Sequence, residues 1–229
     1  MTVIADQLQA VRARIAAACH AAGRDPASVT LLAVSKTFGP EAVRVAHAAG
    51  QSAFGENYIQ EAVEKMALLA DLPLQWHCIG PIQSNKTRLV AQHFDWAQTV
   101  DRLKIAQRLH EQRPPHLPPL QVCIQVNVDG GVSKSGVTPA ELLALAREVA
   151  ALPRLQLRGL MCIPDPQPDF EAMKTVFLRA RELYENLRAA GLPLDTLSMG
   201  MSTDLEAAVH AGSTLVRVGT AIFGGRSYA

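Results

Sequence analysis

The feature of this sequence that most constrains its fold is a strict alternation of short apolar runs with longer segments of helical periodicity. Several of the runs are continuously apolar, which is typical of parallel strands that are covered on both faces. Strict alternation of strand and helix predicts a parallel sheet. The eight predicted strands cover residues 29–36, 52–56, 74–80, 96–100, 120–128, 155–163, 196–202 and 214–223.

Helical segments separate these runs, and one more precedes the first of them. In that leading segment, residues 3–22, apolar side chains recur at helical spacing until Gly23 ends the pattern. Eight strands alternating with helices in about 200 residues favour a closed α/β fold, a (β/α)8 TIM barrel, over an open doubly wound sheet. The other predicted helices cover residues 40–49, 58–70, 85–93, 102–113, 138–152, 169–190 and 203–211.

The length of the chain fits one barrel, so we expect a single domain over residues 1–229. Within it the leading helix takes residues 1–22 and the barrel takes residues 29–224. The Pro-rich stretch RPPHLPPL at residues 113–120 joins a predicted helix to the next strand. We interpret it as a short stiff connection rather than a domain boundary.

The charge balance and the positions of the cysteines are typical of a protein in a reducing compartment. The 22 basic and 21 acidic residues give a net charge of +1, which indicates neither a nucleic-acid nor a membrane surface. The sequence has no apolar stretch near the roughly 20 residues that a membrane span needs, and its N-terminus lacks the apolar core of a signal peptide. Most of the cysteines lie in apolar runs, where a thiol behaves as a small hydrophobe. We therefore expect a cytoplasmic protein without a metal site. The sequence leaves the oligomeric state open, and a monomer is the preferred expectation.

Polar side chains collect at the ends of the predicted strands. Functional sites of (β/α)8 barrels lie at the carboxyl ends of the strands, so these side chains are the candidates for function. They are Lys36, Glu56, Asn57, His77, Asn127, Lys134 and Arg217, with Gln83, Ser84, Asn85 and Lys86 following the third strand.

Two segments near the C-terminus suit a phosphate group. Ser202 and Thr203 open a predicted helix, whose first N–H groups are unpaired and lie at the positive end of its dipole. On the next strand Gly219 allows a ligand close to the backbone, and Thr220 adds a hydroxyl. Barrels commonly hold a phosphate in the loops after the seventh and eighth strands. The pairing of the two segments favours phosphate binding over the alternative, a plain capping box over residues 203–206.

Arg217 lies within an apolar strand two residues before Gly219, so the two share one face of that strand. If that face points inward, the guanidinium lies inside the barrel, where a charge needs a partner. The partner is either a carboxylate such as Glu56 or an atom of a ligand. The sequence leaves both alternatives open.

Lys36 ends the first predicted strand, and burial disfavours the charged form of a lysine. A neutral lysine amine is nucleophilic towards aldehydes and forms Schiff bases. Taken alone, a lysine at a strand end more often extends its ammonium group to the rim of the barrel. Together with a phosphate site and an inward arginine at the same mouth, Lys36 instead indicates a site for pyridoxal 5′-phosphate.

Two further residues are candidate contacts to this cofactor. Asn57 follows the second predicted strand and would orient the ring of a ligand. His77 lies inside an apolar run, where a hydrogen-bonded core histidine is the commoner alternative. The stretch SKSG at residues 133–136 lacks the first glycine and the spacing of a P-loop, so we interpret its polarity as that of a loop.

Six motifs together resemble one known family. The sequence is similar to the pyridoxal phosphate homeostasis proteins, which are single-domain barrels similar to the N-terminal domain of alanine racemase. The loop after Lys36 departs from the family pattern, because it reads FGP at residues 38–40 where many relatives have Lys-Pro. The motifs, in order along nearly the whole chain, are VSKT at 34–37, GENYIQE at 55–61, HCIGPIQSNK at 77–86, SKSG at 133–136, SMGMSTDLEAA at 198–208 and VRVGTAIFG at 216–224.

The resemblance implies a role for most of the candidate residues. In a barrel of PLP fold type III, Lys36 would carry pyridoxal 5′-phosphate as an internal aldimine. Ser202 and the backbone of Gly219 and Thr220 would hold the phosphate group. Arg217 would face the pyridine nitrogen.

An arginine at the pyridine nitrogen favours binding over catalysis. Because the pKa of a guanidinium exceeds about 12, it does not protonate the ring nitrogen, and the ring stays a poor electron sink. A racemase also needs a second base on the opposite face of its substrate. The sequence has the tyrosines Tyr58, Tyr184 and Tyr228 and ends at Ala229, directly after the last predicted strand, so we expect no second domain that would present such a base.

We therefore predict a protein that is not an enzyme. It would hold, buffer and deliver pyridoxal 5′-phosphate in vitamin B6 homeostasis, with PLP-dependent apo-enzymes as its partners. Two alternatives stay open: an alanine-racemase-like amino-acid racemase of weak or narrow activity, and a Schiff-base aldolase that acts on a sugar phosphate without a cofactor. The roles of Lys86 and Lys134 and the identity of the apo-enzymes also stay open.

Overall fold

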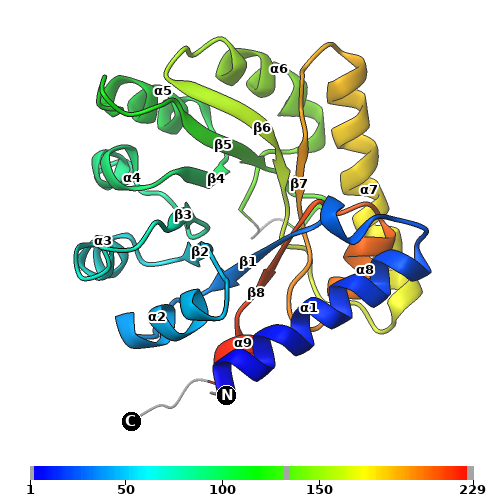
Figure 1. Ribbon diagram of the computed structural model, residues 1–229. Helices are drawn as coiled ribbons and strands as arrows, with labels where there is room; N and C mark the ends of the chain where they lie inside the picture. Colours follow the sequence, from blue (N-terminus) through cyan, green and yellow to red (C-terminus); the bar gives the residue numbers. More distant parts are fainter. Residues whose placement is uncertain (1–2, 132–134, 226–229) are drawn as a thin grey trace.

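The computed structural model describes residues 3–131 and 135–225, and in this part of the chain eight parallel strands close into a barrel. Each strand pairs with the next one along the chain, and β8 pairs with β1 to complete the ring (Figure 1). The predicted (β/α)8 TIM barrel is confirmed. The strands are β1 (Thr30–Val34), β2 (Ala53–Glu56), β3 (Gln75–Cys78), β4 (Trp96–Val100), β5 (Leu120–Gln125), β6 (Leu155–Met161), β7 (Thr196–Ser198) and β8 (Leu215–Val218).

The helices form an outer layer around the strands (Figure 1). The main hydrophobic core lies between these two layers and contains side chains from every helix longer than one turn. The helices are α1 (Val3–Ala21), α2 (Pro40–Ala48), α3 (Ile59–Ala67), α4 (Thr87–His93), α5 (Leu103–Gln112), α6 (Pro139–Ala150), α7 (Phe170–Ala189), α8 (Leu205–His210) and α9 (Thr220–Phe223), with the 3-10 helix η1 (Pro26–Ser28) before β1.

The largest difference from the predicted elements lies at the end of the barrel. The strand predicted over residues 214–223 stops at Val218, and Thr220–Phe223 forms the one-turn helix α9. An apolar run this short fits a strand or a helical turn equally well, so periodicity does not separate the two. In the structure the ring of Phe223 stacks on Phe38 of the loop after Lys36, with 5.2 Å between ring centroids.

The leading helix α1 belongs to the outer layer, where it packs against α8 and the short α9 (Figure 1). It thereby covers the side of β8 and β1 that a longer helix after β8 would cover. Val3, which fitted the predicted apolar pattern, is 71% exposed. The buried stripe of α1 follows helical spacing and consists of Leu8, Val11, Ile15, Ala18 and Cys19.

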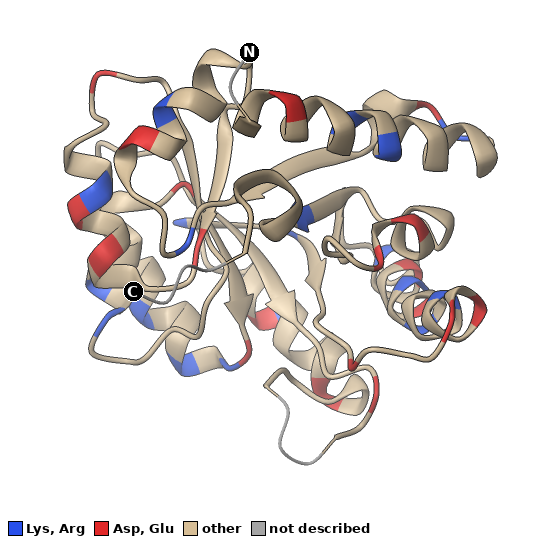
Figure 2. Ribbon diagram, turned by 90° about the horizontal axis from the view of Figure 1, so that it is seen from below, with Lys and Arg blue, Asp and Glu red and all other residues tan. Residues whose placement is uncertain are grey.

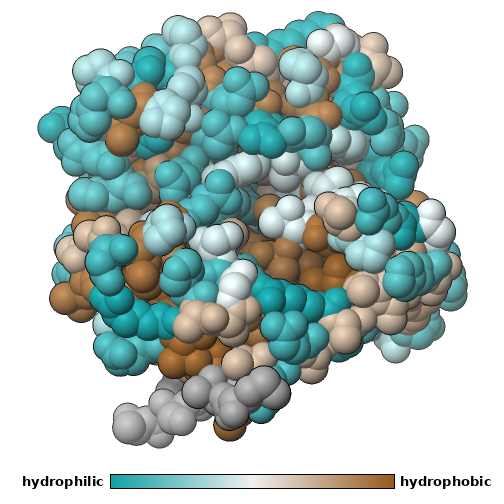
Figure 3. Space-filling model, viewed as in Figure 1, coloured by the Kyte–Doolittle hydropathy of each residue, from teal (hydrophilic) through white to brown (hydrophobic). Residues whose placement is uncertain are grey.

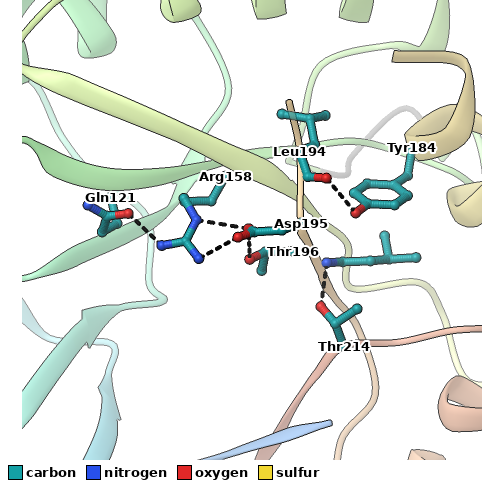
Figure 4. A network of polar contacts seen from close by, with 8 residues as sticks. Gln121, Arg158, Tyr184, Leu194, Asp195, Thr196 and Thr214 are labelled. Atoms are coloured by element: carbon teal, nitrogen blue, oxygen red, sulfur yellow. Dashed lines mark hydrogen bonds and ion pairs between the residues drawn. The ribbon is translucent and has the colours of Figure 1, made fainter. Parts of the chain in front are cut away.

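A polar network occupies the N-terminal end of the barrel (Figure 4). Arg158 donates to both carboxylate oxygens of Asp195, at 2.8 and 2.7 Å, and to Oε1 of Gln121 at 2.7 Å. Its guanidinium also lies 4.8 Å from the centroid of the Trp96 ring. Arg158 and Asp195 are therefore paired with each other at this end of the barrel.

The surface agrees with the charge balance of the sequence. Basic and acidic residues are interspersed over the outer helices (Figure 2). The face drawn in Figure 3 is largely hydrophilic and has a central hollow with a hydrophobic floor. Among the described residues, no helix is long and apolar enough to span a membrane. The cysteines are buried thiols.

Candidate functional site

A cavity of about 260 Å³ lies at the carboxyl ends of the strands, and we refer to it as the Lys36 cavity. Apolar side chains of Val34, Ile79, Ile163 and Met201 form part of its wall. The structure brings seven of the eight predicted site residues together here, and only His77 lies elsewhere. The seven are Lys36, Asn57, Ser202, Thr203, Arg217, Gly219 and Thr220.

Lys36 lies in a tight turn directly after β1 and is half-buried. The turn closes with a hydrogen bond of 3.1 Å from the Phe38 N–H to the Ser35 carbonyl. Thr37 has a φ of 67°, and among the described residues no other residue except glycine has a positive φ. A positive φ is strained for a β-branched residue, so the surrounding structure must hold this turn in place.

A buried ion pair between Glu56 and Lys65 helps to hold the turn of Lys36 in place. Oε1 of Glu56 accepts from Nζ of Lys65 at 2.7 Å and from Oγ of Ser35 at 2.6 Å, and Nζ of Lys65 also donates to the Ser35 carbonyl at 3.0 Å. The Glu56 and Lys65 side chains are 0% and 5% exposed. Burial raises the pKa of Glu56, and the Lys65 ammonium opposes that rise. The pair fixes the backbone from which Lys36 projects.

Arg217 points into the barrel and is 4% exposed. It donates from Nη1 to Oγ of Ser198 at 2.7 Å and from Nη2 to the Cys162 carbonyl at 2.9 Å. Burial lowers the pKa of its guanidinium, because the charged form is poorly solvated there. The alternative ion pair with Glu56 is wrong, because Glu56 points from β2 towards the helix layer and binds Lys65 instead.

Ser202 and the start of α9 lie side by side at one edge of the cavity. The N–H of Ala221 points at Oγ of Ser202 across 3.4 Å. The alternative capping box over residues 203–206 is not formed, because Asp204 is the N-cap of α8 and makes no capping hydrogen bond. Its Oδ1 accepts from the Met201 N–H at 2.6 Å and so shapes the loop before the helix.

Arg14 of α1 supports this loop from outside the barrel. It donates from Nη2 to the Ser202 carbonyl at 3.0 Å, and it pairs with both carboxylate oxygens of Glu206 at 2.8 and 3.0 Å. Sequence reasoning missed this residue. Arg14 and Ser202 lie 188 positions apart, and no local pattern connects a surface arginine to a loop at that distance.

Two glycines at the cavity are required by packing. A Cβ on Gly219 would lie 3.2 Å from the Val34 carbonyl oxygen, so the glycine lets β8 lie close to β1. Gly200 has a φ of +99°, and a Cβ there would lie 2.5 Å from Cβ of Ala208. Gly200 thus allows the sharp turn that carries the chain from β7 into the loop of Ser202.

Asn57 provides the test of whether the cavity suits a polar ligand. Its Oδ1 is buried and has no hydrogen-bond partner among the described residues. Gly80 allows the third loop to pack onto it, because a Cβ on Gly80 would lie 2.2 Å from the Asn57 carbonyl oxygen. A buried amide oxygen without a donor is unfavourable, so a ligand that donates to it would bind better here than an apolar one.

His77 lies towards the opposite end of the barrel, beside a second cavity of about 230 Å³ that Arg158 also lines. Its ring stacks on Trp96 with 4.9 Å between centroids, and its two nitrogens contact Gln75 and Gln98 at 3.0 and 2.9 Å. Complete burial lowers the pKa of His77 to about 3, so the ring is neutral. The geometry is that of a hydrogen-bonded core histidine.

The remaining polar candidates fall outside the Lys36 cavity or outside the described residues. Lys86 is the N-cap of α4 and is not among the lining side chains. The Asn127 side chain binds its own loop, through the Gly131 carbonyl and the Gly130 N–H. Lys134 lies outside the described residues, as does Ser133 of the SKSG stretch.

The tyrosines differ in their surroundings. Tyr184 is buried on α7 and donates from its hydroxyl to the Leu194 carbonyl at 3.1 Å (Figure 4). Tyr58 follows Asn57 and is 50% exposed. Tyr228 lies outside the described residues. Within the described residues there is also no group of three metal-ligating side chains.

Comparisons with known proteins match nearly the whole chain. The sequence profile of the alanine racemase N-terminal domain family matches residues 7–227. A pyridoxal phosphate homeostasis protein of Pseudomonas aeruginosa is 62% identical over 228 residues, which cover 100% of this chain and 98% of the relative.

Two solved structures resemble the fold of this chain. PipY of Synechococcus elongatus, in a structure with PLP bound, has a TM-score of 0.85 and 40% identity over 96% of this chain and 100% of PipY. Alanine racemase of Corynebacterium glutamicum superimposes with a TM-score of 0.72 over 98% of this chain and 61% of the racemase. At 18% identity, that second likeness shows a shared fold alone.

Proposed function

Since this chain belongs to the pyridoxal phosphate homeostasis proteins, within the alanine racemase N-terminal domain family, we propose that it binds pyridoxal 5′-phosphate in the Lys36 cavity and holds it for use elsewhere. One observation carries the proposal: a lysine, a buried arginine and two adjoining backbone turns meet around a single cavity. The structure of PipY with PLP bound supports cofactor binding by this chain as well.

The lysine is the covalent anchor in this proposal. Pyridoxal 5′-phosphate supplies an aldehyde, with which a lysine amine forms a carbon–nitrogen double bond as water leaves. Among the described residues, Lys36 is the lysine that lines the cavity. The buried pair of Glu56 and Lys65 supports its role, because it holds the backbone of the preceding Ser35.

The phosphate group is assigned to the other edge of the cavity. Ser202 and Thr203 would offer hydroxyls and N–H groups. At the start of α9, Gly219 would offer its N–H, and Thr220 its N–H and its hydroxyl. Arg14 supports this assignment from behind, because it holds the Ser202 carbonyl and therefore the course of the loop.

Arg217 is assigned to the pyridine nitrogen, and Asn57 to the ring. An arginine donates a hydrogen bond but keeps its own proton, so the nitrogen it faces stays unprotonated. Carbanion chemistry on the cofactor gains little from such a partner. We therefore propose a carrier rather than a catalyst, and PLP-dependent apo-enzymes as the recipients.

A cofactor titration tests the binding site. We expect purified protein to gain a visible absorption band with pyridoxal 5′-phosphate, and borohydride to fix the cofactor to Lys36. Lys36→Ala should lose the band, whereas Lys104→Ala, at an exposed lysine of α5, should keep it. A spectrally silent native protein at saturating cofactor would refute the proposal.

Turnover separates the carrier from its two rivals. Incorporation of solvent deuterium at Cα of alanine, at a rate typical of enzymes, would establish a racemase and overturn the carrier role. Cleavage of a sugar phosphate by protein without cofactor would establish an aldolase. For the carrier itself, activity should return to a PLP-dependent apo-enzyme when the loaded protein is added.

Two broader expectations belong to the same proposal. We propose a cytoplasmic location, which the buried thiols Cys19, Cys78, Cys123 and Cys162 support. We also propose a monomer. Sedimentation equilibrium of the loaded protein tests this, and a mass of twice 24.7 kDa would contradict it.

A further inference from the structure

A line of hydrogen bonds crosses the inside of the barrel and ends at Arg217. Nη1 of Arg217 contacts Oγ of Ser198 at 2.7 Å, and Oγ of Ser198 contacts Oε1 of Gln98 at 2.6 Å. Nε2 of Gln98 then contacts Nδ1 of His77 at 2.9 Å, and Nε2 of His77 contacts Oε1 of Gln75 at 3.0 Å. We call these five side chains the Arg217 relay.

The relay runs in one direction only. A guanidinium has no acceptor, so Arg217 donates to Ser198, whose single hydroxyl proton then goes to the carbonyl oxygen of Gln98. The amide nitrogen of Gln98 therefore faces His77 and donates to its Nδ1. His77 must carry its proton on Nε2, from which it donates to Gln75. The charge on Arg217 thus sets the orientation of every other member.

The barrel is what joins these residues. His77 and Gln98 come from the neighbouring strands β3 and β4, and Ser198 and Arg217 come from the neighbouring strands β7 and β8. The contact between Gln98 and Ser198 links the two pairs across 100 positions of sequence. These four side chains are at most 4% exposed, so water has little access to compete for their hydrogen bonds.

The relay leaves the guanidinium little freedom. Ser198 holds one terminal nitrogen and the Cys162 carbonyl holds the other, which fixes the plane of the group. Stacking on Trp96 holds the His77 ring at the far end. The low pKa of the buried ring keeps it neutral, and a neutral ring is the state that can accept at Nδ1.

We propose that His77, Gln98 and Ser198 are positioning residues for Arg217, through which they set how tightly the Lys36 cavity holds the ring of its ligand. His77 is then not a contact to the cofactor and acts through Arg217. The inference rests on the proposed function only where the ligand is taken to be pyridoxal 5′-phosphate. The arrangement of the relay itself is independent of that ligand.

The first experiment reads the relay in cofactor-free protein by nitrogen-15 NMR. We expect the His77 ring at neutral pH as the tautomer with its proton on Nε2, and slowly exchanging side-chain N–H signals from Arg217. In Gln98→Glu, the carboxylate offers only acceptors, so the His77 proton should appear on Nδ1. A native His77 protonated on Nδ1, or on both nitrogens, would overturn the relay.

The second experiment interrupts the relay at Gln98 and measures hydrogen exchange of the Arg217 side-chain N–H groups. Gln98→Met keeps the volume and removes both hydrogen bonds, while Met161→Leu is a matched control in the apolar part of the barrel interior. Exchange of the Arg217 N–H signals should accelerate in Gln98→Met and not in Met161→Leu. Equal exchange in both variants would show that the relay only fills space.

The third experiment measures cofactor affinity at equilibrium. Gln98→Met removes the acceptor that orients the Ser198 hydroxyl towards Arg217, and this loss of a buried hydrogen bond should weaken the binding of pyridoxal 5′-phosphate by about tenfold, with Met161→Leu close to native. Native affinity in a folded Gln98→Met would overturn the positioning role. If the native protein binds no cofactor, the proposed function fails, and the two NMR experiments still decide on the relay.

A second substitution guards against a variant that does not fold. Ser198→Thr keeps the hydroxyl that links Arg217 to Gln98, whereas Ser198→Ala removes it. Affinity and slow Arg217 exchange should be retained in the threonine variant and lost in the alanine variant. The reverse order, or equal values in both, would contradict the proposal.

Discussion

Removal of the ammonium group of Lys65 should be one of the most damaging single changes in this protein. Lys65→Met keeps most of the aliphatic stem but leaves the Glu56 carboxylate, which is fully buried, with only the Ser35 hydroxyl as a donor. The Ser35 carbonyl also loses its contact of 3.0 Å. Breaking one side of a buried ion pair costs about 3–5 kcal/mol of the free energy of unfolding. Glu61, whose Oε1 lies 3.8 Å from Nζ of Lys65, is also an acid and so does not replace the lost positive charge.

Urea unfolding at pH 7, followed by circular dichroism, measures this loss. With a slope of about 3 kcal/mol per molar urea, the unfolding midpoint should fall by about 1–1.7 M. The double variant Glu56→Gln/Lys65→Met removes both charges and should recover most of the loss. Lys174→Met serves as the control, because its ammonium lies 3.8 Å from a Glu171 side chain that is 77% exposed, and such a pair contributes little.

The pH dependence gives a second reading of the same variant. Burial already raises the pKa of Glu56, and without Lys65 nothing charged opposes that rise. A carboxyl whose pKa is raised by folding destabilises the native state as the pH increases through that pKa. The deficit of Lys65→Met should therefore be smaller at pH 5 than at pH 7. A loss below about 1 kcal/mol at pH 7, or a double variant as unstable as the single one, would refute the reasoning.

Two further changes are predicted from single sites. Because burial lowers the pKa of His77 to about 3, protonation of the unfolded chain should destabilise the native protein as the pH falls below 7. From pH 7 to 5.5 this should lower the free energy of unfolding by about 1.3 kcal/mol, a loss that His77→Phe should not show, and equal pH slopes of the two proteins in urea titrations would contradict it. Gly200→Ala forces a Cβ to within 2.5 Å of Cβ of Ala208 at a φ of +99° and should cost about 2 kcal/mol or more. Gly39→Ala, where an added Cβ meets nothing within 4 Å, is the control, and equal unfolding midpoints for the two variants would exclude the clash.

Much of the fold could be predicted from the sequence because alternation leaves few topologies. The ends of the strands could not, because residues that leave the sheet are often as apolar as those within it. The strand predicted over residues 120–128 ends at Gln125, after which Val126 forms a bridge with Val137 of the following loop. The run that became α9 was misread for the same reason.

The sequence predicted those parts of the site that lie at the carboxyl ends of the strands, because these ends converge. Lys36 and Arg217 could be placed at one mouth because every parallel strand delivers its carboxyl end to the same rim. Their supports could not be predicted. Whether Glu56 faces the helix layer, or Gln98 reaches Ser198, depends on strand register and on which strands face each other across the barrel. Alternation within one strand carries no such information.

These supports also differ in kind, and the difference has a consequence for the Lys36 cavity. The backbone before Lys36 is held by a charge pair, whose attraction disappears when Glu56 takes up a proton. The hydrogen bonds that hold Arg217 come from neutral groups, and His77 is the titratable side chain among the other members of its relay. Burial raises the pKa of Glu56 and lowers that of His77 to about 3. As the pH falls, Glu56 therefore takes up a proton before His77 does, and the backbone before Lys36 loses its ion pair first. Acidification should therefore loosen the lysine edge of the cavity while Arg217 is still held in place.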